Sequence, residues 1–82
     1  MRADRLVALI ERHRTLLTTD GASVLDAAQA EQPVIRHNGP DMHHHLPSRG
    51  TVTRETWNAA WQVWSERWHP ALSALASSRG WQ

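Results

Sequence analysis

The feature that most constrains the fold is a row of four tryptophans between Thr53 and Trp68. Trp57, Trp61, Trp64 and Trp68 fall at offsets of zero, four, seven and eleven residues, which places them on one face of a helix. These indoles present more apolar surface than any other segment of the chain. We therefore expect a central helix, capped by Thr53, whose tryptophan face is covered by the rest of the fold or by a partner.

The length and the composition of the chain limit what else can stabilise it. With 82 residues and no cysteine, the chain is expected to form one domain, residues 1–82, without disulfides or thiolate metal sites. Nine arginines against eight acidic residues give a net charge of +1, which is too small to favour a nucleic-acid partner on electrostatic grounds. No apolar run is long enough for a membrane span, and no signal-peptide pattern is recognisable. The expected location is the cytoplasm or a virion.

The N-terminal segment predicts a first helix over residues 3–17. Its apolar face repeats the spacing of the tryptophan row, so we expect the two faces to pack directly against each other. An antiparallel arrangement would place His13 against Trp61 as a partly buried core histidine. The residues of this face are Leu6, Ile10, His13 and Leu17.

Two further helices are indicated by their start and stop signals. Asp20 and Gly21 suggest a turn with Gly21 in a left-handed conformation, after which Ser23 would cap a short helix over residues 24–31. Pro70 predicts that the tryptophan helix, 54–68, ends and that a new helix, 70–79, begins. One continuous, kinked helix is the alternative. Gly80 is a typical left-handed helix stop.

The segment 33–50 is predicted to be a long loop, because its prolines and glycines interrupt helices and leave little room for strands. The expected fold class is therefore all-α, a small domain of three or four helices with one long Pro/Gly/His-rich loop. A loop of this length is often functional. The interrupting residues are Pro33, Gly39, Pro40, Pro47 and Gly50.

The same segment contains the only side chains that suggest metal chemistry. Asp41, His43 and His45 alternate along the chain, and in an extended segment residues two apart point the same way. Imidazole and carboxylate groups are ligands for zinc or nickel. No second ligand pair lies at a recognised spacing, so we expect no resident cofactor, and a zinc or nickel site at these residues is an alternative to a solvated histidine-rich loop.

No catalytic pattern was found: there is no nucleophile beside a base, no paired carboxylate motif and no phosphate-binding glycine loop. Tryptophan and arginine are enriched in protein interfaces, and one helix cannot cover four indoles. We expect a non-enzymatic interaction or structural module that binds a protein or its own copies, as a subunit of a cellular complex or a phage particle. The alternatives are a metal-binding protein and a small-ligand or enzyme accessory subunit. The expected partner-binding residues are Trp64, Trp68, Trp81, Leu9, Leu16 and Val63.

Overall fold

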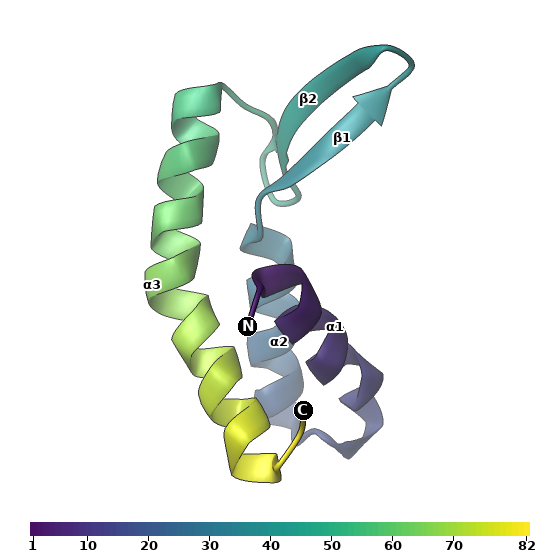
Figure 1. Cartoon of the computed structure of the whole chain (residues 1–82), viewed down its shortest axis with the longest axis vertical. Coiled ribbons are helices and arrows are strands. Elements are labelled where there is room, and N and C mark those ends of the chain that lie inside the picture. The colour runs from purple at the N-terminus through teal and green to yellow at the C-terminus, as the bar shows by residue number, and fades with distance from the viewer.

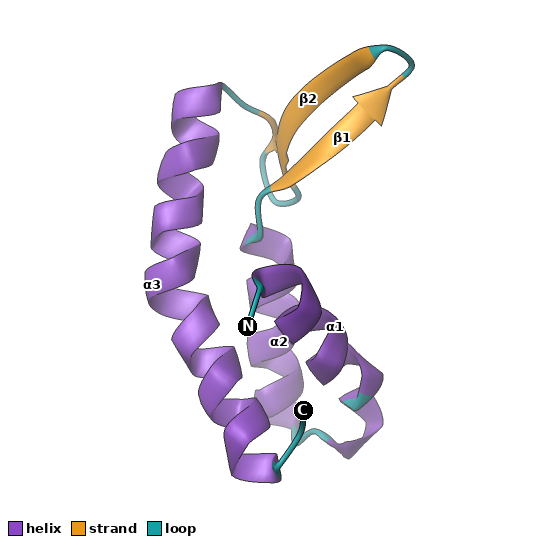
Figure 2. Cartoon of the chain, in the orientation of Figure 1, coloured by secondary structure: helices purple, strands orange, loops and turns teal.

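The computed structural model describes residues 1–82 as three α-helices and a three-stranded antiparallel sheet (Figure 1, Figure 2). The prediction of an all-α fold is wrong, because most of the segment 33–50 forms strands rather than a loop. The elements in chain order are α1 (Ala3–Arg12), a 3-10 turn (Arg14–Leu16), α2 (Thr19–Glu31), β1 (Val34–Asn38), β2 (Asp41–Leu46), β3 (Gly50–Thr51) and α3 (Arg54–Arg79).

The strands form because prolines and glycines lie between them rather than inside them. β1 and β2 make an antiparallel hairpin joined by Gly39 and Pro40. Gly39 has a φ of +62°, which suits the first central residue of a type II′ turn. Pro33 immediately precedes β1 and Pro47 immediately follows β2, so neither proline removes a donor from the strand ladder. Gly50, with a φ of +88°, begins the short strand β3 beside the end of β2.

The α3 helix is continuous over 26 residues and includes Pro70. The prediction of two separate helices, 54–68 and 70–79, is therefore wrong, and the alternative of one continuous helix is right. Pro70 has no N–H to donate to the carbonyl of Glu66, which weakens the helix locally. Figure 1 shows α3 curving towards α1 and α2 in its C-terminal half.

Both ends of α3 follow the predicted signals. The Thr53 hydroxyl accepts a hydrogen bond from the Thr56 N–H at 3.2 Å, which satisfies one of the unpaired donors at the start of the helix. Gly80 takes the left-handed conformation, with a φ of +71°. The next residue, Trp81, donates its N–H to the carbonyl of Ala76 at 3.0 Å and so folds back on the helix.

The start of α2 differs from the prediction. The helix begins at Thr19, five residues earlier than the predicted 24–31, and Ser23 lies inside it. Its cap is Thr18, whose hydroxyl accepts a hydrogen bond from the Gly21 N–H at 3.0 Å. Gly21 lies in the first turn and does not have a positive φ, so the predicted left-handed residue is absent.

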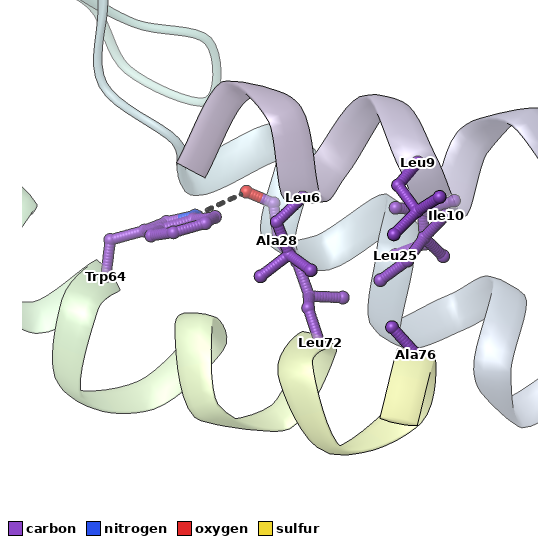
Figure 3. Close-up of a cluster of buried hydrophobic side chains, with 8 residues drawn as sticks. All are labelled: Leu6, Leu9, Ile10, Leu25, Ala28, Trp64, Leu72 and Ala76. Atoms are coloured by element: carbon purple, nitrogen blue, oxygen red, sulfur yellow. Dashed lines mark hydrogen bonds between the residues drawn. The ribbon is translucent and has the colours of Figure 1, made fainter. Parts of the chain in front are cut away.

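The hydrophobic core lies between α1, α2 and the C-terminal two thirds of α3 (Figure 3). Leu25, Leu72 and Ile10 are fully buried, and Trp64 is only 1% exposed. The Trp64 indole N–H donates to the carbonyl of Ala28 at 2.8 Å, which joins α3 to α2. None of the three helices is both long enough and apolar enough to cross a membrane. The full core is formed by Leu6, Leu9, Ile10, Leu25, Ala28, Trp64, Leu72 and Ala76.

The relative direction of α1 and α3 is opposite to the antiparallel arrangement considered for the two helices. The start of α1 lies beside the middle of α3, since the His69 ring donates to the carbonyl of Met1 at 2.7 Å. The end of the 3-10 turn lies beside the end of α3, where Arg79 donates to the carbonyl of Leu16 at 3.2 Å. The two helices are therefore parallel. His13 stacks on Trp81, with ring centroids 4.3 Å apart, and not on a tryptophan of the row.

A polar network joins α1 to α2 on the outside of the core. The Arg14 guanidinium donates to Glu11, to Asp26 at 2.8 Å and to Gln29. The Gln29 amide also donates to Glu11, at 3.3 Å. The hydrogen bond from Arg14, and then that from Gln29, lower the pKa of the Glu11 carboxyl. The two carboxylates in turn raise the pKa of Arg14. All of these groups are at or near the surface, so the network contributes little to the stability of the fold.

The sheet lies beside the N-terminal half of α3, away from the core (Figure 1). The sheet is attached to the rest of the fold through contacts near Trp57 and Leu46. The Trp57 indole N–H donates to the carbonyl of Val34 at 2.9 Å, and the Trp57 ring meets His44 edge to face at 5.1 Å. Leu46, at the end of β2, is 3% exposed. The far end of the hairpin carries exposed residues, Met42 among them.

Candidate binding surface

The four tryptophans of the row make different contacts although they lie on one helix. Trp57 and Trp64 donate their indole N–H groups to backbone carbonyls, and Trp68 donates to the Glu31 carboxylate. Trp61 has no hydrogen-bond partner for its indole N–H in the structure. Its ring lies nearly perpendicular to Trp57, at 88° with centroids 6.1 Å apart, and to Trp64. Trp61 is therefore the one member of the row whose indole N–H has no partner within the protein.

Trp57 and Trp61 line a groove between α3, the N-terminal turn of α1 and the start of β1. We call it the tryptophan groove. It holds a volume of about 390 Å³, and its only charged residue is Asp4, whose carboxylate accepts from the Gln32 amide at 2.8 Å. An apolar groove with a free indole donor suits an apolar side chain next to a backbone carbonyl. The lining residues are Asp4, Pro33, Val34, Ile35, Trp57 and Trp61.

The outer edge of β1 is open next to this groove, because the strand order is β1-β2-β3 and nothing pairs with β1 on its other side. The register shows which backbone groups point outward. Val52 donates its N–H to the carbonyl of His44 at 2.9 Å, so the backbone groups of His44 point towards β3. Ile35 pairs with His44, so the backbone groups of Ile35 must point to the free edge of β1. Because the direction alternates along a strand, the backbone groups of His37 point there as well. The N–H and C=O groups of Ile35 and His37 have no hydrogen-bond partner.

The free edge carries one cationic side chain, that of Arg36. Arg36 lies between the two outward-facing residues, is exposed and makes no ion pair. Imidazoles of β2 lie opposite β1 on both faces of the hairpin, where His43 pairs with Arg36 and His44 with Ile35. Asp41, at the turn, is the only acidic residue of the two strands. A carboxylate on an added extended segment would therefore meet a favourable charge at Arg36.

The structure separates the residues that the sequence suggested as partner-binding. Trp64 and Leu9 belong to the core, with exposures of 1% and 4%. Trp68 and Trp81 are half-buried and pack against the core. Leu16 and Val63 are exposed, at 56% and 53%, but they lie on different elements, the 3-10 turn and the middle of α3. Two of the six residues are therefore buried in the core, and the exposed ones come from different elements.

The suggested metal ligands do share a strand. Asp41, His43 and His45 alternate along β2, so their side chains lie on one face of the hairpin, as predicted for an extended segment. No group of three or more His, Asp or Glu side chains is placed to hold a metal ion together. A metal site at these residues would need a further ligand from another chain or a rearranged hairpin.

Comparison with known proteins gives no relative. No protein-family model matches the chain, and no curated protein or solved structure is significantly similar to it. Any functional inference therefore rests on the geometry of this surface. The tryptophans of the groove are part of the row that the sequence singled out, whereas the strand edge was missed. The signals for it were the β-branched pair Val34 and Ile35 and the turn residues Gly39 and Pro40.

Proposed function

We propose that this protein is a non-enzymatic interaction module, a subunit of a larger assembly, that binds an extended segment of another protein along β1. The segment would add a fourth strand to the sheet and place an apolar side chain in the tryptophan groove. The open edge of β1 directly beside that groove is the observation that carries the proposal. Strand addition takes its affinity from backbone hydrogen bonds and its specificity from pockets for alternate side chains.

A partner of different sequence fits the edge better than a second copy of this chain. In antiparallel self-pairing, the register that joins the most residues of β1 pairs Ile35 with His37 of the other copy. Arg36 would then face Arg36 of that copy, and like charges directly opposite each other are destabilising. A carboxylate on the added strand would instead pair with this guanidinium. The proposed partner is therefore an extended segment with acidic and apolar residues in alternation.

The energetics assign distinct roles to the edge and the groove. Four backbone groups, the N–H and C=O of Ile35 and His37, can each form a hydrogen bond worth about 0.5–1.5 kcal/mol net. Ordering the added strand costs about 1–2 kcal/mol for each residue fixed. Edge pairing alone therefore gives little affinity. Burial of an apolar side chain against Trp57 and Trp61 supplies the rest of the binding free energy, at roughly 25 cal/mol per Å2 of apolar surface buried.

The test compares two substitutions at one edge position in a capture experiment with extract of the source organism. His37→Pro removes an outward-facing N–H and leaves the β1–β2 ladder intact, whereas His37→Ala keeps the N–H. We expect the parent and His37→Ala to retain the same partner and His37→Pro to lose it. Circular dichroism checks that both variants are folded.

A second substitution examines the groove separately. Trp61→Ala removes the ring with the free indole N–H and should weaken capture of the same partner. The isolated protein should be monomeric in light scattering. Equal capture by all variants, or a stable oligomer of the isolated chain that His37→Pro does not change, would contradict strand addition at β1.

A further inference from the structure

A second hollow lies where the C-terminal end of α2, the turn between β2 and β3 and the middle of α3 meet. It holds a volume of about 220 Å³. The turn is fixed to α2 there, because the Ser48 N–H donates to the carbonyl of Ala30 at 3.1 Å. We call this hollow the arginine pocket, because Arg49 of the turn and Arg67 of α3 both line it.

The inner wall of the arginine pocket is apolar. Leu46 and Trp64, which are 3% and 1% exposed, line it from the sheet and from α3. Val63 extends this apolar wall outward and is 53% exposed. A ligand with a hydrocarbon body would cover Val63 and gain contact with the buried residues.

The rim of the pocket offers donors without partners. Neither Arg49 nor Arg67 forms an ion pair, since the ion pairs of the molecule all involve Arg14. The Arg67 guanidinium lies over the Trp68 ring, 4.7 Å from its centroid, which restricts its position without using its donors. The Ser48 hydroxyl also has no hydrogen-bond partner in the structure.

The one acidic residue of the pocket is already engaged. The Glu31 carboxylate accepts a hydrogen bond from the Trp68 indole N–H. With two arginines and one glutamate, the lining carries a net charge of +1. A ligand with a single negative charge balances this lining, whereas a dianion such as phosphate would bring excess negative charge close to Glu31.

We propose that the arginine pocket binds a small monocarboxylic acid with an apolar body. The carboxylate accepts hydrogen bonds from Arg49 and Arg67, for which the planar guanidinium is well suited, and from the Ser48 hydroxyl. The hydrocarbon part packs on Trp64 and against Val63. This site lies apart from the free edge of β1, so it does not depend on the function proposed above.

The test uses hexanoate as the probe, with hexanamide as a neutral analogue of the same shape and inorganic phosphate as an anion without an apolar body. Binding is followed by the NMR signals of the Trp64 indole N–H and the Val63 methyl groups. We expect saturable shifts of both signals with hexanoate. Hexanamide and phosphate should cause no saturable shift at the same concentrations.

Substitutions then assign the charge recognition. Arg49→Gln and Arg67→Gln should each weaken hexanoate binding by at least about tenfold, since each removes a charge-assisted hydrogen bond. Arg12→Gln, at the end of α1, is the matched control and should bind like the parent, as should His37→Pro. Equal binding of hexanamide and hexanoate, or unchanged affinity in both pocket variants, would overturn the proposal.

Discussion

At the scale of single residues, Trp64 holds the three helices together. Its ring is buried between α1, α2 and α3, and its N–H satisfies the carbonyl of Ala28. We predict that Trp64→Ala lowers the free energy of unfolding by about 3–5 kcal/mol, because it leaves a cavity and removes this hydrogen bond. Urea unfolding followed by circular dichroism measures the change.

Trp61→Ala provides the comparison within the same row. Trp61 is only half-buried and has no hydrogen-bond partner for its N–H, so its truncation should cost clearly less than that of Trp64. If both variants lost the same stability, the indoles would share the core equally. The assignment of Trp61 to a binding groove would then fail.

At the scale of elements, the position of the α2 cap distinguishes the structure from the sequence pattern. Thr18→Ala removes the hydroxyl that accepts the Gly21 N–H and should cost about 0.5–2 kcal/mol of stability. Ser23→Ala, inside the helix on an exposed site, should change stability by less than about 0.5 kcal/mol. Thermal unfolding of the two variants measures which substitution is more destabilising. The reverse order of destabilisation would place the helix start near Ser23.

Local signals correctly predicted the ends of the helices where one residue determines the conformation. Thr53 and Gly80 behave as expected, because a side-chain acceptor and a left-handed glycine act within one turn of chain. The prediction that the helix ends before Pro70 was wrong. A proline inside a helix costs about 3 kcal/mol, and tertiary packing on both sides of the proline can offset that cost. Leu72 and Ala76, both buried beyond Pro70, supply such packing.

The hairpin was missed because its strands are short and unusual in composition. Three consecutive histidines in β2 carry no strong strand preference, and prolines near a segment argue against strands unless their positions are taken into account. Only Val34 and Ile35 are strong strand formers in β1. The decisive signal was the pair Gly39 and Pro40, which makes a two-residue turn between segments of similar length.

The candidate binding surface could not be located from the tryptophan row alone. The offsets zero, four, seven and eleven give the same intervals in either direction, so matched faces on two helices do not show whether the helices are parallel or antiparallel. The parallel arrangement of α1 and α3 puts the core at the C-terminal side of the row. Trp64 is therefore buried, whereas Trp57 and Trp61 lie beside the sheet and line the groove.

At the scale of the whole molecule, the structure has a packed end and an extended end. Its principal extents are 40 × 25 × 22 Å. The eight-residue core lies entirely among the helices, whereas the hairpin is held by Leu46, the start of β1 and the contacts of Trp57. Regions with few buried apolar contacts open more easily than the core that supports them. The strand addition proposed at β1 would benefit from this uneven stability.

This difference predicts two levels of hydrogen exchange. Amides of α2 around Leu25 and Ala28 should exchange only through global unfolding, because they surround the core. The inward-facing amides of β1 and β2, such as that of His43, should exchange through local opening of the hairpin, at a clearly lower free energy. NMR-detected exchange under native conditions measures both. Equal opening free energies would mean that the hairpin and the helices unfold as one unit, and the stability of the sheet would then depend on the core rather than on its own local contacts.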